Sequence, residues 1–209
     1  KQCVPADGLT SAQAAMAEPL AVCLHAIKQA GNLSGKTVLI TGCGPIGCLS
    51  VLAARYAGAK RIIATDLSDY TLDIAQTCGA DIVLNTSTKP DALNAFQREK
   101  GQIEVHLECS GAAPALAAGV ACLCPGGILV QLGLGGDMNI PLQAITTKEI
   151  TLRGSFRFHS EFANGVNLMK SGLIVVDPLI THSFGIAEAK TAFETAGDRS
   201  QAMKVQISF

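Results

Sequence analysis

The stretch ITGCGPIGC (residues 40–48) sets three glycines, Gly42, Gly44 and Gly47, in a G-x-G-x-x-G pattern. It directly follows a β-branched run and opens an apolar helical pattern at Pro45, a residue that suits the first turn of a helix. In this context Gly42 permits a tight turn, Gly44 lets the backbone approach a pyrophosphate, and Gly47 lets helix and strand pack closely. The phosphates would meet free N–H groups at the helix N-terminus. We therefore predict a dinucleotide site.

An acidic residue further along supports this prediction. Asp66 ends the next β-branched run, RIIATD, about 20 residues after Gly47, where a carboxylate can accept both ribose hydroxyls. Its charge would repel the 2′-phosphate of NADP, and residues 67–71 contain no Arg to receive that phosphate. NAD is favoured. A methyltransferase or a purely structural sheet, which use similar glycine loops, stays as the alternative.

The hydrophobic pattern from Thr37 onward alternates short β-branched runs with longer amphipathic ones, which is typical of a parallel sheet with crossover helices. The fold class predicted is therefore α/β, with a complete, doubly wound, six-stranded Rossmann sheet. The expected strands are 37–41, 61–66, 81–85, 104–109, 127–133 and 149–156, and the expected helices begin at Pro45, run from Ser68 to Cys78, and lie near 91–98 and 114–122.

Two flanks lie outside this sheet. The first holds a helical run from Ser11 to Ala30, and the last holds two helical patterns and a terminal strand, KVQISF. Neither makes a domain alone, so we expect a lead segment at 1–17, an NAD-binding domain at 18–156, and a tail at 157–209 that belongs to a second domain. Without an initiator Met or a signal-peptide pattern, the chain is expected to begin partway through a longer protein.

Composition excludes several function classes. A net charge of −1 without a basic cluster argues against nucleic acid or an anionic membrane as partner, and no apolar run approaches the roughly 20 residues of a membrane helix. The eight cysteines are scattered, which favours reduced thiols in a cytoplasmic protein over disulfides or a zinc cluster. Cys43 is interpreted as a small space-filling residue rather than a reactive thiol; the alternative is sensitivity to oxidation, because a helix N-terminus can lower a thiol pKa.

Five segments carry a family resemblance: AEPLAVCLHA, GCGPIG, ATDLS, GGILVQLGLGG and RGSFRF. Together they resemble the medium-chain, zinc-dependent dehydrogenases of the sorbitol dehydrogenase group, over essentially the whole chain. The segment from KEITLRGSFRFHSEF onward resembles the bacterial L-idonate 5-dehydrogenases, which reversibly oxidise a secondary alcohol of a sugar acid to a ketone, giving 5-ketogluconate. The sequence is therefore expected to act on a small sugar acid or polyol.

The resemblance implies a GroES-like catalytic domain, built from an N-terminal half and the returning tail. In that half the family keeps its zinc ligands, a Cys and a Gly-His-Glu motif, which this chain lacks. This part of the enzyme should therefore bind cofactor without turning substrate over. The mechanism implied for the whole enzyme has zinc holding the substrate alkoxide while hydride passes to NAD.

Two residues are expected near the substrate through this resemblance. Glu18 would lie at the catalytic zinc, as a metal ligand or bonded to its water; its alternative is a helix-start carboxylate favoured by the dipole. Arg157 would point to the substrate and border the cofactor, or else be a surface residue at a strand end. Phe158 stands where sorbitol dehydrogenases have Tyr, and His25 is expected at a domain interface rather than on a metal.

The remaining cofactor contacts also come from the resemblance. Pro45 and Ile46 would cover the pyrophosphate. Backbone groups after the fifth and sixth strands would hold the nicotinamide; these are Leu132, Gly133, Leu134, Ser155 and Phe156.

Three further expectations concern the protein as a whole. A homo-oligomer, dimer or tetramer, is expected through pairing of the sixth strands. Within the enzymes, another polyol or a threonine-type dehydrogenase is the alternative. From a different class, the chain could be a stand-alone NAD-sensing Rossmann module.

Overall fold

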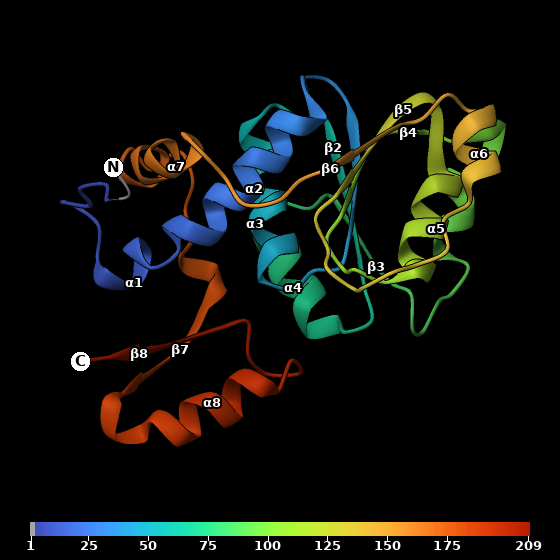
Figure 1. The fold of residues 1–209 in the computed structure, drawn as a ribbon. Helices are drawn as coiled ribbons and strands as arrows, with labels where there is room; N and C mark the ends of the chain where they lie inside the picture. The colour runs from blue at the N-terminus through green and yellow to red at the C-terminus, as the bar shows by residue number, and fades with distance from the viewer. Residues whose placement is uncertain (1–2) are drawn as a thin grey trace.

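A single six-stranded parallel sheet organises most of the chain (Figure 1). The computed structural model describes residues 3–209, so the first two residues of the predicted lead segment lie outside the described residues. The strand order is β3-β2-β1-β4-β5-β6, and every neighbouring pair is parallel. This is the doubly wound order that places a ligand crevice between β1 and β4. The predicted fold class is confirmed.

The observed elements follow the prediction closely within the sheet. β1 and β2 have the expected bounds, whereas β5 begins four residues earlier than expected and β6 is shorter. The strands are β1 Thr37–Thr41, β2 Arg61–Asp66, β3 Ile82–Asn85, β4 Ile103–Glu108, β5 Leu123–Gln131, β6 Thr151–Gly154, β7 Ile180–Gly185 and β8 Lys204–Ser208. The helices are α1 Ser11–Ala14, α2 Ala17–Ala30, α3 Pro45–Tyr56, α4 Asp69–Thr77, α5 Ala113–Cys122, α6 Leu142–Thr147, α7 Glu161–Lys170 and α8 Ala189–Gly197.

The sheet separates two hydrophobic cores, because successive side chains of a strand point to opposite faces. Val38 and Ile40 of β1 join the core with α2, α3, α4 and α7. Leu39, between them, joins the core beneath α5 and α6. Both faces of the central strands are thus dry, which explains their nearly continuous apolar sequences. Figure 1 shows the two groups of helices on opposite sides of the sheet.

The helical run expected from Ser11 to Ala30 is two helices, and this part of the prediction was wrong. Helix α1 begins with a capping box between Thr10 and Gln13 and ends at Ala14, and α2 begins at Ala17. Pro19 in the first turn of α2 has no N–H to donate to the carbonyl four residues earlier. A continuous helix through this point would therefore lack a backbone hydrogen bond.

Two other predictions need correction. The helix expected near 91–98 consists of 3₁₀ turns, Ala92–Phe96 and Arg98–Lys100, which end in positive φ values at Glu99, Lys100 and Gly101. In the tail, β7 was not predicted; it pairs in parallel with β8, and α8 connects the two strands. The β7 sequence, ITHSFG, is too polar to be recognised as a buried strand.

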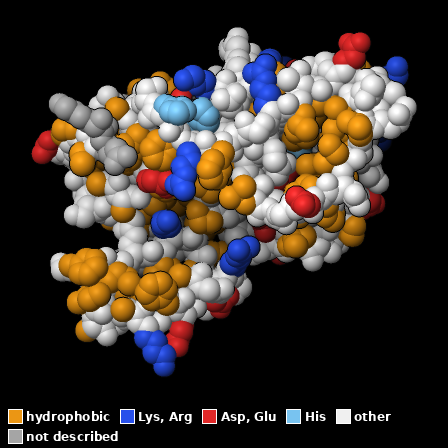
Figure 2. Space-filling model, in the orientation of Figure 1, with side chains coloured by type: hydrophobic (Ala, Val, Ile, Leu, Met, Phe, Trp, Pro, Cys, Tyr) orange, Lys and Arg blue, Asp and Glu red, His pale blue; other side chains and the backbone are white. Residues whose placement is uncertain are grey.

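Helix α7 of the tail packs against α2, whereas β7, β8 and α8 lie apart from the large sheet (Figure 1). Figure 2 shows hydrophobic side chains gathered over that lower-left part of the molecule. Ile186, Phe193 and Phe209 are all exposed there. No helix within residues 3–209 is long and apolar enough to cross a membrane. In the same range the eight cysteines form no disulfide, in agreement with the prediction of free thiols.

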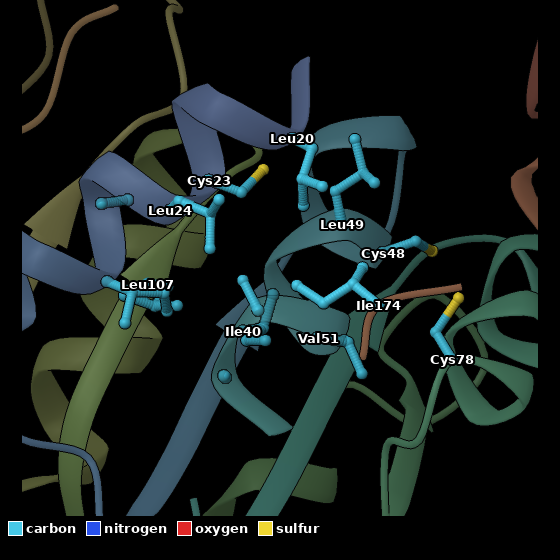
Figure 3. Packing of buried hydrophobic residues seen from close by; sticks show 14 of the residues in the cluster. Leu20, Cys23, Leu24, Ile40, Cys48, Leu49, Val51, Cys78, Leu107 and Ile174 are labelled. Atoms are coloured by element: carbon cyan, nitrogen blue, oxygen red, sulfur yellow. The ribbon is translucent and has the colours of Figure 1, made fainter. Parts of the chain in front are cut away.

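Helix α2 also packs tightly on α3, which carries the glycine loop at its start. Figure 3 shows Leu20, Cys23 and Leu24 of α2 near Leu49 of α3 in one buried cluster. The Cys23 thiol donates to the Ile46 carbonyl at 3.3 Å. The position of α3 is therefore set from both sides, by the sheet and by α2.

A buried carboxylate at the start of α7 ties the tail to α2. Glu161 accepts hydrogen bonds from Lys28 Nζ at 3.0 Å and from the His159 N–H at 2.7 Å, and His25 Nδ1 lies 3.4 Å away. Burial raises the pKa of Glu161, but these backbone and side-chain donors outweigh it and lower the pKa to about 2. The carboxylate is thus stabilised as an acceptor between the two helices.

We expect Glu161→Gln to destabilise the protein in a pH-dependent way. The folded pKa, about 2, lies below the unfolded value of 4.5, so the stabilisation is complete above about pH 4.5 and is lost as pH falls to about 2. Urea denaturation should show that the variant has a free energy of unfolding lower than that of the wild type by on the order of 2 kcal/mol near neutral pH. This difference should shrink as the pH falls from about 4.5 to about 2. Glu194→Gln, which breaks an exposed pair with Lys190, is the control and should change stability by less than about 0.5 kcal/mol. A gap that does not vary with pH would contradict this role for Glu161.

Candidate cofactor site

The glycine loop connects β1 to α3, as predicted. Gly42 donates its N–H to the Thr65 carbonyl of β2 at 2.8 Å and has a φ of +83°, a conformation that side chains rarely adopt. Gly44 is the N-cap of α3, and its carbonyl accepts a hydrogen bond from Cys48 N at 2.9 Å. The chain therefore turns sharply from strand into helix.

Each of the three glycines meets a different surrounding. A Cβ added at Gly42 would lie 2.8 Å from backbone atoms of Ser110, and one added at Gly47 would overlap the Gly42 carbonyl oxygen. A Cβ at Gly44, in contrast, would meet nothing within 4 Å. Gly42 and Gly47 are thus required by packing inside the protein. Gly44 faces open space, where a ligand could approach the backbone.

The start of α3 is free to bind an anion. Among the described residues no side chain caps this helix, and its first turn contains no acidic residue. Pro45 has no N–H, and the next residues, Ile46 and Gly47, begin the set of helix N–H groups that lack a partner within the helix. These groups and the helix dipole favour a phosphate at this position.

Asp66 lies beside the loop, at the end of β2. Its Oδ2 accepts the Cys43 N–H at 2.5 Å, and its Oδ1 accepts the N–H groups of Leu67 at 2.7 Å and Ser68 at 3.2 Å. A carboxylate has about four acceptor positions, so capacity remains for hydroxyl donors. The two sequence features that predicted a dinucleotide are thus in direct contact.

Cys43 itself is buried, which agrees with a space-filling residue and not with the alternative of an oxidation-sensitive thiol. Its thiol donates to the Thr65 carbonyl at 3.5 Å. Burial raises the pKa of the Cys43 thiol, and the nearby Asp66 charge raises it further. The helix N-terminus therefore does not make Cys43 a reactive thiolate.

The loops after β5 and β6 form the next part of the same edge. Leu132 is buried, and a Cβ at Gly133 would clash with the Gly111 backbone, so these two residues are closely packed. Ser155 donates its N–H to the Gln131 carbonyl at 2.9 Å, whereas its buried hydroxyl has no hydrogen-bond partner within the described residues. Leu134 and Phe156 are largely exposed beside them. An unpaired buried hydroxyl here is available to a ligand.

A polar cluster beneath these loops was not predicted. Glu108, at the end of β4, is completely buried and lies opposite Thr41 of β1 and Gln131 of β5 in the strand register. Gln131 Nε2 donates to Glu108 at 2.7 Å, and Thr41 Oγ1 contacts both Glu108 and His106. Burial lowers the pKa of His106 to about 3, so this imidazole is neutral. The one available sequence signal was a Glu that ends an otherwise apolar buried strand.

The expected substrate and metal residues stand apart from this cluster. Glu18 is exposed in the first turn of α2. Arg157 is exposed with a φ of +60°, and its guanidinium lies 5.3 Å from the Phe156 ring centre, a cation–π distance. His25 contacts Glu161 between α2 and α7, as expected of an interface histidine. Within residues 3–209, no group of three His, Cys, Asp or Glu is placed to hold a metal ion.

Comparison with known proteins gives consistent matches. A family model described as zinc-binding dehydrogenase matches residues 45–171. The chain is 40% identical over 210 residues to L-idonate 5-dehydrogenase (NAD(P)(+)) of Escherichia coli, covering 100% of this chain and 61% of that protein. It is 37% identical over 205 residues to sorbitol dehydrogenase of Bos taurus, covering 96% and 57%.

A solved structure matches as well. The crystal structure of L-idonate 5-dehydrogenase from Escherichia coli superposes with a TM-score of 0.94 at 40% identity, over 100% of this chain and 60% of that one. The chain thus spans about three fifths of the length of these relatives.

The different glycine surroundings lead to a stability prediction. Gly47→Ala should lower the free energy of unfolding by about 3 kcal/mol, because its Cβ would overlap the Gly42 carbonyl. Gly44→Ala, the matched control in the same loop, should change it by less than about 1 kcal/mol. Chemical denaturation of both variants would check this. Equal losses for the two would mean that α3 is not held by this close approach.

Proposed function

The chain belongs to the zinc-binding dehydrogenase family, as its sequence resemblance predicted, and we propose that it is the cofactor-binding part of an NAD-dependent polyol or sugar-acid dehydrogenase. The observation that carries the proposal is the glycine loop. Gly44 leaves the start of α3 open, and Asp66 is bonded to the same loop. This pairing supports a pyrophosphate at the helix and a ribose at the carboxylate.

The dinucleotide would extend from Asp66 across the loop to the ends of β5 and β6. Pro45 and Ile46 would cover the pyrophosphate. The nicotinamide would be held near Leu132, Gly133, Leu134, Ser155 and Phe156. The unpaired Ser155 hydroxyl supports this placement, since a ligand amide could supply its missing partner. The bound cofactor supplies the hydride acceptor; the protein supplies orientation.

Arg157 would contact the substrate. Its guanidinium is exposed beside Phe156 and offers several donors to hydroxyl or carboxylate oxygens. A sugar acid such as L-idonate, oxidised to 5-ketogluconate, fits this chemistry. Phe158 has no hydroxyl where sorbitol dehydrogenases have Tyr, which argues against recognition of sorbitol itself.

Zinc would need ligands beyond these 209 residues. Glu18 is the single candidate assigned here, and the described residues do not assemble a site around it. Glu18 would contribute as a zinc ligand, or through a bond to zinc-bound water, once the remaining ligands are present.

The domain arrangement is part of the same proposal. Residues 1–17 and 157–209 would belong to a GroES-like catalytic domain, and 18–156 to the NAD-binding domain. The exposed side chains of Phe193 on α8, Ile186 just after β7 and Phe209 just after β8 support a surface that another part of the protein covers. The exposed edge strand β6 supports pairing between subunits in a dimer or tetramer.

Two alternative functions would use the same cofactor site. Another polyol or threonine-type dehydrogenase would use the same cofactor site with a different substrate pocket. A stand-alone NAD-sensing module would bind the cofactor without zinc or turnover.

Asp66→Ala tests the cofactor assignment. In fluorescence titrations, NADH should bind the wild type more tightly than NADPH, and the variant should lose NADH affinity by about tenfold or more while NADPH changes less. Asp73→Ala removes an equal charge from an exposed position on α4 and should leave both affinities unchanged. Binding of neither cofactor by the wild type would remove the basis of the proposal.

Metal content and turnover test the enzyme assignment. The full-length protein should contain zinc by elemental analysis and should reduce NAD with L-idonate in preference to sorbitol. Zinc with turnover of another polyol or of threonine would support the first alternative. Cofactor binding with neither zinc nor turnover would support the NAD-sensing module.

A further inference from the structure

Glu108 collects hydrogen bonds from three separate segments at the switch point of the sheet. Its Oε1 accepts from the Ser110 N–H at 2.9 Å and from the Ser110 hydroxyl; its Oε2 accepts from the Gly111 N–H at 2.9 Å and Gln131 Nε2 at 2.7 Å. Thr41 Oγ1 donates to Oε1 at 3.3 Å. The donors come from the ends of β1 and β5 and from the loop after β4.

The neighbours of Glu108 match an acceptor-only group. Thr41 has one hydroxyl proton, and when it donates to Glu108, His106 Nε2 must donate to Thr41 across their 2.9 Å contact. His106 Nδ1 is then the bare nitrogen, and it has no partner among the described residues. In this chain of hydrogen bonds each group donates to the next one: His106 Nε2 donates to Thr41 Oγ1, and Thr41 Oγ1 donates to the Glu108 carboxylate.

Ser110 and Gly111, the two loop residues that donate to Glu108, pack against the glycine loop (42–47) and the loop after β5 (133–136), here called the cofactor loops. Backbone atoms of Ser110 fill the space where Gly42 would carry a Cβ. The Gly111 backbone fills the corresponding space at Gly133 and Gly135. A shift of Ser110 or Gly111 would therefore move the glycine loop on one side and the loop after β5 on the other.

A completely buried carboxylate is costly for stability, and an apolar or amide side chain is often the cheaper choice at such a position. A carboxylate is favoured only where several donors need an acceptor at one point. Here the donors belong to segments whose backbones touch at glycines, Gly42 on Ser110 and Gly133 on Gly111. No side chain separates these backbones, so their spacing is fixed.

We propose that Glu108 is a positioning residue that sets the spacing between the glycine loop and the loop after β5, and thereby the affinity for the dinucleotide. The inference rests on the proposed function, because it names a residue that shapes the same cofactor site. Glu108 is not expected to touch the cofactor. Its effect passes through Ser110 and Gly111, and through its own Oε2, which lies 2.7 Å from the point where Gly133 would carry a Cβ.

The test compares two Glu→Gln variants on one strand of the full-length protein. Glu104, at the opposite end of β4, accepts the Thr37 N–H at 2.8 Å and so also links β4 to β1, but far from the cofactor loops. Glu108→Gln should raise the Kd for NADH at least tenfold by fluorescence titration, whereas Glu104→Gln should leave it within twofold. Circular dichroism and the melting temperature show whether each variant is folded.

Amide hydrogen exchange separates local positioning from general loss of structure. In Glu108→Gln, exchange should become faster at residues 42–47 and 133–136 but stay unchanged in β7. Equal acceleration throughout the chain, or equal loss of NADH affinity in the two variants, would overturn the proposal. So would wild-type affinity in a folded Glu108→Gln protein.

A milder variant keeps the test decisive if Glu108→Gln does not fold. Gln131→Met removes the donor to Oε2 and also the Nε2 bond to the Gly133 carbonyl at 2.9 Å, with little change in shape, and it should raise the Kd for NADH several-fold. Unchanged affinity in this variant would overturn the proposal. A wild-type protein that fails to bind NADH would instead refute the proposed function, so the two failures are distinguishable.

Discussion

The contact between Gly47 and the Gly42 carbonyl is the constraint on which the site depends. It allows α3 to start directly above the end of β1, with no side chain between helix and strand. From this position the helix presents its free N–H groups at the crevice between β1 and β4. The neighbouring bond from Cys43 to Asp66 then joins the loop to the next strand. Under the proposed function, backbone geometry rather than flexible side chains would therefore fix the phosphate and ribose positions relative to each other.

Much of this arrangement was predictable because it has local causes. The β-branched runs, the glycine spacing and Pro45 each restrict the backbone within a few residues, and the predicted bounds of β1 and β2 agree with the structure. The parallel, doubly wound arrangement was predicted from the alternation of strands and helices. Local patterns failed where tertiary contacts decide the outcome. The 92–96 segment forms 3₁₀ turns, and the polar β7 exists because β8 pairs with it.

The cofactor loops illustrate the same division within the site. The roles of Gly42 and Gly47 could be assigned from spacing alone, since each follows from a backbone requirement. Glu108 could not be assigned, because two of its donors, Thr41 and Gln131, are far from it in sequence and meet it only in the folded sheet. Glu18 and Arg157 were assigned from family resemblance, and the contacts that would give them a function involve groups beyond this chain. The sequence thus predicted a residue's role best where all the residues that determine this role lie in one short segment.

The two cores and the polar cluster together explain why cofactor binding and substrate choice can be separated. Apolar packing on both faces holds the strands in register, whereas the polar contacts are concentrated at the strand ends, around Glu108 and Asp66. Substitutions in the tail or in a covering domain would leave these contacts intact. Under the proposed function, substrate recognition would vary around Arg157 and the exposed surface of the tail while the loops assigned to the dinucleotide keep their spacing. The buried carboxylate stabilises the part of the site that must stay constant, and the exposed residues around it form the part that can change.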